Sequence, residues 1–462
     1  MINMQIKPNH SLFSYFQTMT HLSKNLYNEA NYLFRQVFFG LTKEEAERHV
    51  NEVATIHALN DVVDTLNVIR NRNGTKPFEY LNEVHYYLPK YHLDGFLKLT
   101  KQVDYMALPA QCNQRTLSLL YDDWTSYFEA RKDYEKNPTK YLGKPKPPRY
   151  AKKDGYKVCI FTNQICVIKK DKQGTYLKFP KTKLRYYLGD LDFSDKKLKE
   201  VRIVPKNQMI NLELVYETEV KEAQEIQIDD ARIAAVDLGL ENLIAMVDNT
   251  GNAPLLFKGK KIKSVNHYYN KQKAYYTSIF REGKDPKEGP HTSKRLERIT
   301  NKRNNRIKDI LHKVSTRFIQ MCICRNIDII VIGHNKNWKQ NIELGRVNNQ
   351  NFVQVPFTML IHMITYKAEN AGIKTVIQEE SYTSKASALN NDEIPVYLDG
   401  SEQRNFHGKR ICRGLYRSGR GIIINADING ASNILRKAYP SKPKYKQWRM
   451  GVVDTPVCIS YC

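Results

Sequence analysis

Three acidic residues in the second half of the chain stand where predicted strands end or a helix begins. Asp237 and Glu380 each come after a short apolar run typical of a buried strand, and Asp427 opens a segment of helical pattern. Parallel strands bring their carboxyl ends to one edge of a sheet, where ligands usually bind. Carboxylates gathered there repel one another unless a cation neutralises them, and hard oxygen ligands select Mg²⁺ or Mn²⁺ over zinc. Two such ions about 4 Å apart can activate water and stabilise a leaving oxygen, so the set indicates phosphodiester hydrolysis.

Each acid taken alone has a simpler explanation. A turn residue or a helix cap accounts for any one of them, and Asp427 in particular could cap its own helix. Glu379 precedes Glu380 and is the alternative third ligand. The prediction of a metal centre therefore depends on the three acids as a set.

Alternating strands and helices are expected to position these acids. The turn after the second strand predicts a hairpin, and the later strand, helix and strand predict a parallel sheet. The expected strands are 233–236, 243–247, 327–332 and 373–377, with a turn at 248–252 and a helix at about 356–371.

The first half of the chain is predicted to be helical and then β-rich. Apolar residues recur at steps of three and four between residues 15 and 134, as the one-sided stripe of a packed helix requires. Three prolines within 143–153 remove backbone donors and disfavour helical geometry, so they mark a boundary. Apolar and polar residues then alternate over 210–216, which predicts a small antiparallel β unit.

The charge balance points to a polyanionic partner. Lys and Arg number 73 against 48 Asp and Glu, a formal net charge of +25, and 29 tyrosines could stack on bases. No run of about 20 apolar residues and no signal-peptide pattern occurs. The eight cysteines include no CxxC pair, so we expect no zinc. We expect a soluble cytoplasmic protein that binds nucleic acid and neither a membrane nor a small-molecule substrate.

Several sequence blocks resemble, in order, those of the TnpB family, the RNA-guided nucleases of bacterial insertion sequences that are ancestral to type V CRISPR effectors. The similarity spans about residues 230–460, and its last block is the most diagnostic. The blocks are DLG at 237–239, IGHN at 332–335, WKQ at 338–340, ESYTSK at 380–385, RGLY at 413–416 and NADINGASN at 425–433.

The resemblance implies an α+β multidomain protein with guide RNA and target DNA as partners, in a bacterial cytoplasm. Asp237 and Asp427 match the first and last catalytic acids of the family. The implied parts are a helical recognition lobe at 15–134, a small antiparallel β wedge domain at 135–229 with its first strand in 1–14, and an RNase H-like (RuvC) α/β nuclease domain at 230–462 with a basic insertion at 381–424.

Two departures from the family pattern matter. Many relatives place the middle Glu directly after the strand that corresponds to 327–332, where this chain has Gly333 and His334. Glu380 resembles the substitute in a branch with a rearranged centre. Many relatives also carry a four-cysteine zinc ribbon between the second and third catalytic blocks, whereas 381–426 contains only Cys412.

Three groups of basic residues are candidates for phosphate contact, with a solvated charged surface as the alternative for each. The first group leads into the β unit: Lys144, Lys146, Arg149, Lys152 and Lys153. The second lies on one face of a long helical stretch: Arg295, Arg298, Lys302 and Arg306. The third lies in the nuclease region: Lys339, Lys385, Lys409, Arg410 and Arg413.

The sequence predicts an RNA-guided DNA endonuclease of a transposable element, with Asp237, Glu380 and Asp427 as catalytic metal ligands. A catalytically inactive RNA-guided repressor is one alternative, and a compact CRISPR effector of the same descent is another. Strand-transfer transposases on this fold order their acids Asp, Asp, Glu, whereas this chain orders them Asp, Glu, Asp.

Overall fold

The computed structural model describes residues 1–191, 193, 196–217, 227–285, 287–335, 354–395, 405–412, 414–440 and 455–461. Contacts within the chain divide it into two compact units, Met1–Glu219 and Val220–Cys462. The boundary lies ten residues before the one expected from the sequence, and the expected domain limits remain predictions.

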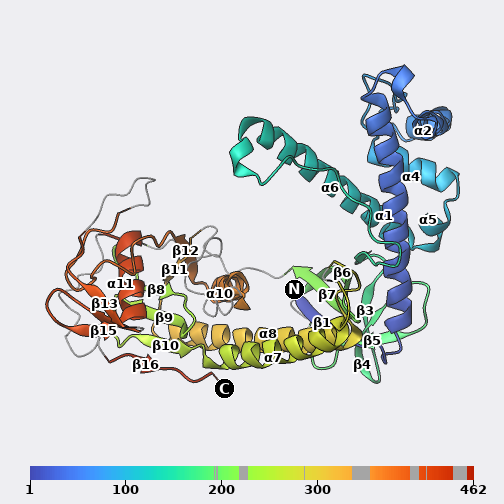
Figure 1. Ribbon diagram of the computed structural model, residues 1–462. Helices are drawn as coiled ribbons and strands as arrows, with labels where there is room; N and C mark the ends of the chain where they lie inside the picture. Colours follow the sequence, from blue (N-terminus) through green and yellow to red (C-terminus); the bar gives the residue numbers. More distant parts are fainter. Residues whose placement is uncertain are drawn as a thin grey trace. The chain divides into compact units, whose positions relative to one another are not determined.

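The first unit opens with a strand and continues with helices, drawn in blue to teal in Figure 1. The predicted helical run is broken between α3 and α4, where Gly74 takes a φ of +64° and Pro89 precedes the first turn of α4. The elements are β1 (Ile2–Ile6), α1 (Phe13–Leu41), a 3₁₀ turn (Glu45–Glu47), α2 (Val50–Asp61), α3 (Val63–Arg72), α4 (Lys90–Leu99), α5 (Val103–Ala107), α6 (Ala110–Lys136) and a 3₁₀ turn (Pro138–Lys140).

Two antiparallel sheets complete the first unit. One has the strand order β1-β7-β6-β2 and the other β3-β4-β5. The first strand of the chain pairs with the last strand of this unit, Ile2 opposite Leu214. The further strands are β2 (Cys159–Thr162), β3 (Val167–Asp171), β4 (Gly174–Lys178), β5 (Arg185–Tyr187), β6 (Lys197–Lys206) and β7 (Met209–Glu217).

One hydrophobic core serves both the helices and the sheets of this unit. Phe34 of α1 and Trp124 of α6 pack with ring centroids 4.4 Å apart, and both side chains are fully buried. Ile203 and Leu212, from the four-stranded sheet, belong to the same cluster. The helical and β-rich parts of the first unit are therefore stabilised together by one apolar interior.

The second unit is built on a six-stranded sheet with helices along both faces. Its elements are β8 (Ile233–Asp237), β9 (Asn242–Asp248), β10 (Leu255–Lys258), α7 (Lys260–Arg281), α8 (Lys294–Cys324), β11 (Ile329–Gly333), α10 (Phe357–Asn370), β12 (Lys374–Gln378), β13 (Lys409–Cys412), β14 (Leu415–Arg417), β15 (Ile423–Asn425), α11 (Ala426–Ala438) and β16 (Val457–Cys458).

The strand order of this sheet is β12-β11-β8-β9-β10-β16. The expected hairpin is confirmed, since β9 and β10 pair antiparallel, and the expected parallel sheet is confirmed, since β11 lies parallel to both β8 and β12. Three antiparallel strands followed by two parallel ones beside the first form the RNase H-like arrangement. The expected α+β fold class is thus confirmed.

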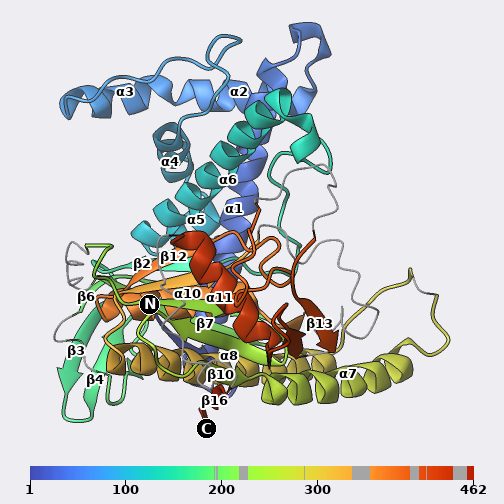
Figure 2. The same ribbon diagram turned by 90° about the vertical axis from the view of Figure 1, so that its left-hand side faces the viewer.

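Alternating residues of β8 face two separate cores. Ala234 and Val236 pack on one face, which α8 and α10 cover, while Ile233 and Ala235 pack on the other, which α11 covers. Figures 1 and 2 show α7 and α8 side by side and α11 against the sheet. A sheet covered on both faces explains why its inner strands β8 and β11 are almost entirely apolar.

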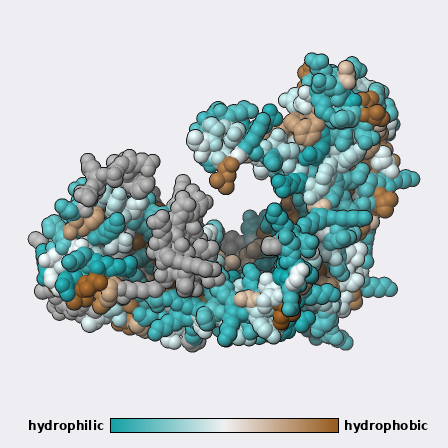
Figure 3. All heavy atoms as spheres, viewed as in Figure 1, coloured by the Kyte–Doolittle hydropathy of each residue, from teal (hydrophilic) through white to brown (hydrophobic). Residues whose placement is uncertain are grey.

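The surface over α7 and α8 is predominantly hydrophilic in Figure 3. Among the described residues, no helix is long and apolar enough to span a membrane. A separate three-stranded antiparallel sheet, β13-β14-β15, leads directly into α11.

Candidate active site and basic surfaces

The fold delivers the three candidate acids to one edge of the RNase H-like sheet. Asp237 is the last residue of β8, and Glu380 lies two residues beyond β12. Because β8 and β12 both lie parallel to β11, which separates them, both acids stand at the same edge of the sheet, where the carboxyl ends of these strands lie. Asp427 lies in the first turn of α11, which packs against β8, β11 and β12.

Asp427 does not cap its helix. The side-chain oxygen of Asn425 accepts hydrogen bonds from the backbone N–H groups of Asp427, at 2.9 Å, and Ile428, at 3.2 Å. The Asp427 carboxylate accepts a hydrogen bond from Asn242 Nδ2 at 2.7 Å, and Arg410 Nη2 lies 3.7 Å from its Oδ1. With Asn425 as the cap, this carboxylate is directed toward polar groups from β9 and β13.

Glycines make room for two of the carboxylates. A Cβ atom at Gly430 of α11 would lie 2.5 Å from Asp237 Oδ2, and one at Gly333 would lie 2.7 Å from Glu380 Oε2. Real Cβ atoms essentially never approach that closely. Backbone without side chains therefore lets α11 and β11 approach the acids, as glycine permits at close contacts.

The electrostatics indicate that the three acids are near neighbours. Burial raises the pKa of Asp237 well above its usual value, and the charges of Asp427 and Glu380 raise it further, while Arg410 opposes the shift. Burial also raises the pKa of Glu380, to about 7, with the charge of Glu379 adding to the effect. Negative charge is thus disfavoured at this edge unless a cation balances it.

Glu379 has a different environment. It forms an ion pair with Lys437 of α11, and its Oε1 accepts a hydrogen bond from Ser381 N at 2.6 Å. Burial alone would raise the pKa of Glu379, but the hydrogen bonds from Lys437 and Ser381 leave it below its usual value. These contacts satisfy Glu379 within the protein and distinguish it from Glu380.

The three carboxylates offer the oxygen ligands that a divalent cation prefers, but they are not arranged as a complete metal-binding site. In the described part of the chain, no group of three or more His, Cys, Asp or Glu side chains is arranged to hold a metal ion. The oxygen donors and their mutual repulsion nevertheless suit a divalent cation. Ligation by all three would require the carboxylates to draw together around the ion.

Amides on α11 support the segment that follows Glu380. Asn433 Nδ2 donates to the carbonyls of Thr383 and Ala386 at 2.8 and 2.7 Å, and Asn429 Nδ2 donates to Ala386 O at 2.8 Å. Both amides are fully buried. Asn335 Oδ1 accepts from Glu380 N at 3.0 Å, so the backbone around Glu380 is fixed from two sides.

The first basic group lies on a segment bound along α1. Asn28 exchanges two hydrogen bonds with the backbone of Ala151, at 2.9 and 2.8 Å, and Lys24 Nζ donates to Lys153 O. This segment is therefore anchored to the helix rather than being a solvated linker. All five predicted cations on it are exposed: Lys144, Lys146, Arg149, Lys152 and Lys153.

The second basic group lines a groove of about 890 Å³ between α7 and α8. All four predicted residues line it: Arg295, Arg298, Lys302 and Arg306. The sequence analysis missed the opposite wall, which includes Lys261, Tyr268 and Tyr269. On α7, Ser264, Val265, Tyr268 and Tyr269 follow Lys261 by three, four, seven and eight residues, so this spacing would have indicated that they share one helix face.

The third basic group is only partly described. Lys385, Lys409 and Arg410 are exposed, and Arg410 reaches the Asp427 carboxylate. Lys339 and Arg413 lie outside the described residues. Arg410, predicted from the sequence to contact nucleic acid, thus lies beside a candidate metal ligand, a position that the sequence pattern did not indicate.

The fold and the acidic edge define an RNase H-like protein with a candidate metal centre. Residues 213–339 match the OrfB_IS605 family model, described as "Probable transposase", and residues 357–434 match the model "Cas12f1-like, TNB domain". The TnpB-like protein ORF457 of Acidianus two-tailed virus is 27% identical over 212 residues, 45% of this chain and 42% of the relative. Together these matches support a TnpB-family protein, and the match with ORF457 spans less than half of that relative.

Solved structures of larger assemblies are also similar. A Cas12f1–sgRNA–target DNA complex has a TM-score of 0.45 at 12% identity, over 94% of this chain and 83% of that chain. A ternary complex of AacC2c1 with sgRNA and extended non-target DNA has a TM-score of 0.44 at 9% identity, over 91% of this chain and 70% of that chain.

Proposed function

We propose that this chain is a metal-dependent DNA endonuclease of a transposable element, directed to its target by a guide RNA. The observation that carries the proposal is the meeting of Asp237, Asp427 and Glu380 at one edge of an RNase H-like sheet. The similarity to the TnpB family supports the same activity.

The three carboxylates would hold Mg²⁺ or Mn²⁺. When bound, such ions activate water and stabilise the leaving oxygen of a phosphodiester. Asn242 orients Asp427 through its 2.7 Å hydrogen bond, and the glycines at 333 and 430 leave room for the carboxylates of Glu380 and Asp237. Arg410, 3.7 Å from Asp427, is placed to bind a phosphate that enters the site.

Nucleic-acid binding would rest on the basic surfaces of both units. The groove between α7 and α8 combines cations with tyrosines, which suits phosphate contact together with stacking. The exposed cations on the segment anchored to α1 offer a second phosphate-binding surface. In this scheme base pairing with the guide selects the sequence, and the protein holds the backbones.

Sequencing the RNA that co-purifies with the chain tests the proposal first. We expect one discrete species with a constant scaffold and a variable guide. Changing the guide segment should then redirect cutting of a plasmid target, and Asp237→Ala should bind the same target without cutting it. Unchanged cut sites with a new guide would contradict RNA guidance, and guided binding without cutting by the wild type would instead identify a repressor.

The genomic origin of the variable guide distinguishes a nuclease of a transposable element from a compact CRISPR effector. A guide encoded at the end of the transposable element supports the proposal. A guide transcribed from a CRISPR array would instead identify a compact effector of the same descent.

A further inference from the structure

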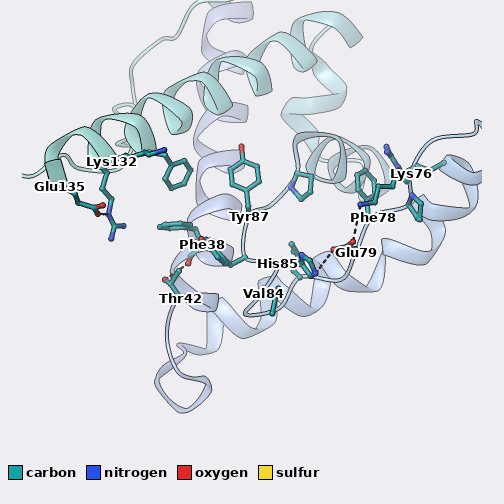
Figure 4. A pocket seen from close by; sticks show the side chains of 17 residues that line it. Phe38, Thr42, Lys76, Phe78, Glu79, Val84, His85, Tyr87, Lys132 and Glu135 are labelled. Carbon is teal, nitrogen blue, oxygen red and sulfur yellow. Dashed lines mark hydrogen bonds and ion pairs between the residues drawn. The ribbon is translucent and has the colours of Figure 1, made fainter. Parts of the chain in front are cut away.

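An aromatic cleft in the first unit is lined by none of the candidate site residues described above. It has a volume of about 890 Å³ and is formed by the ends of α1 and α6 and by the segment between α3 and α4. Figure 4 shows Phe38 and Tyr87 at its centre, with Lys132 and Glu135 of α6 on one side and Glu79 and His85 on the other.

The floor of the cleft is rigid and apolar. Phe38 is buried and packs against Phe128, with ring centroids 5.3 Å apart, and Tyr87 packs edge-on against the buried Phe34 at 5.3 Å. Tyr86 lies 6.0 Å from Phe38. Packing of this kind fixes the rings before any ligand arrives, which lowers the entropy lost on binding.

Two of these rings remain accessible. Tyr86 and Tyr87 are each 42% exposed, so each offers ring surface to the cleft. Phe78 differs, because Arg70 lies 4.1 Å over its ring and His92 stacks on it at 5.2 Å. Tyr86 and Tyr87 are therefore the open stacking surfaces in this set.

The rim carries both signs of charge with cations in excess. Arg70, Lys76, Arg131 and Lys132 line the cleft beside two acids, Glu79 and Glu135. Glu79 already contacts His85 at 2.8 Å and Lys76 at 3.8 Å. The cations favour phosphates, and exposed tyrosines beside cations are the usual platform for unpaired bases.

The acids on the rim offer hydrogen-bond acceptors, toward which ribose and deoxyribose differ. A carboxylate repels phosphate, but it accepts a hydrogen bond from a ribose 2′-hydroxyl, which deoxyribose lacks. Thr42 adds a hydroxyl at the same rim. A rim that mixes cations with hydrogen-bond acceptors therefore fits ribonucleotides better than deoxyribonucleotides.

We propose that this cleft binds unpaired bases of an RNA strand by stacking them on Tyr86 and Tyr87, while cations of the rim contact the flanking phosphates. The proposal rests on the proposed function only in taking RNA as a partner of the chain. It assigns the site to single-stranded RNA, because paired bases do not offer free faces to a side chain.

Photocrosslinking of the full chain tests the site directly. The probe is a 4-thiouridine RNA of about ten nucleotides, near the length that single-strand sites cover. We expect crosslinks within residues 76–89 and 128–135, and binding by Tyr86→Ala/Tyr87→Ala weaker by roughly 5- to 100-fold, as loss of base stacking predicts. Tyr86→Phe should bind normally because it keeps the ring.

Matched controls separate stacking from unfolding. Tyr91→Ala removes a tyrosine that is 66% exposed on α4 and outside the cleft, so it should bind as the wild type does. If the double variant fails to fold, Lys132→Glu tests the exposed rim instead and should also weaken binding.

Three results would overturn the proposal: no crosslink in these residues, equal affinity in the wild type and the folded variants, or equal binding of DNA of the same sequence. Crosslinks in the cleft of a protein that lacks guided cleavage would uphold this inference while rejecting the proposed function. Guided cleavage without crosslinks in the cleft would support the proposed function and reject this inference.

Discussion

Lys437 of α11 forms an ion pair with Glu379, whereas the carboxylate of the next residue, Glu380, lies against Gly333. Two neighbouring acids thus have separate surroundings, as expected where adjacent side chains of an extended segment point oppositely. Glu379 is the acid that pairs with Lys437, whereas Glu380 is the acid that resembles the substitute ligand of the family's rearranged branch.

Exchange of each acid for its amide should therefore have unequal effects. Glu380→Gln should lower the cleavage rate by about a hundred-fold or more, because it removes negative charge from a metal ligand at unchanged volume. Glu379→Gln should lower it by less than about tenfold, since a partly exposed ion pair contributes only about 1 kcal/mol. Single-turnover cleavage at saturating guide measures both.

The two variants are each other's controls. Equal, complete loss in both would indicate a shared or structural role for the pair. Full activity in Glu380→Gln with loss in Glu379→Gln would exchange their assignments.

A second prediction concerns Gly430, whose absent side chain makes room for Asp237. Gly430→Ala should lower cleavage by about a hundred-fold, because a Cβ 2.5 Å from Asp237 Oδ2 must displace the carboxylate, and misplacement by about 1 Å has effects of that size. The helix itself should tolerate alanine, which is a better helix former by about 1 kcal/mol. Cleavage assays with thermal unfolding as a fold check measure the effect.

Gly143→Ala is the matched control, since a Cβ there would meet no atom within 4 Å. If Gly430→Ala cleaves at the wild-type rate, the position of the Asp237 carboxylate is not required for catalysis.

The apolar runs of the sequence predicted the strands β8, β9, β11 and β12, because buried strands are largely apolar. The RNase H-like fold was implied only by the resemblance to the TnpB family. The apolar pattern could not separate Glu379 from Glu380, because that difference depends on Lys437, which is 58 residues away in the chain. The capping role of Asn425 was also missed, since Asp427 is an equally good cap by residue type. The cleft at Tyr86 and Tyr87 forms by tertiary packing of three chain segments, so no local sequence pattern indicates it.

A third prediction concerns the groove between α7 and α8. Arg298→Gln/Arg306→Gln should weaken RNA binding and reduce the slope of log affinity against log salt by about two, one for each lost phosphate contact. Arg298 and Arg306 line the groove, whereas Arg317 is exposed on α8 outside it. Arg317→Gln is therefore the control. An unchanged slope in the double variant would place RNA elsewhere on the protein.

The last prediction concerns the ion itself, and it separates oxygen ligation from a cysteine cage. Cleavage should require Mg²⁺ or Mn²⁺ and should survive a zinc-selective chelator, because hard carboxylate oxygens prefer these ions. Mg²⁺ should also raise the melting temperature of the wild type, since a cation that binds the folded state relieves repulsion around Asp237. Asp237→Ala should lose both the cleavage and the Mg²⁺-dependent rise, while guided DNA binding persists because the basic surfaces remain. Unfolding on zinc removal would reveal a structural zinc site, and an unchanged melting temperature with Mg²⁺ in the wild type would argue against ligation by these acids.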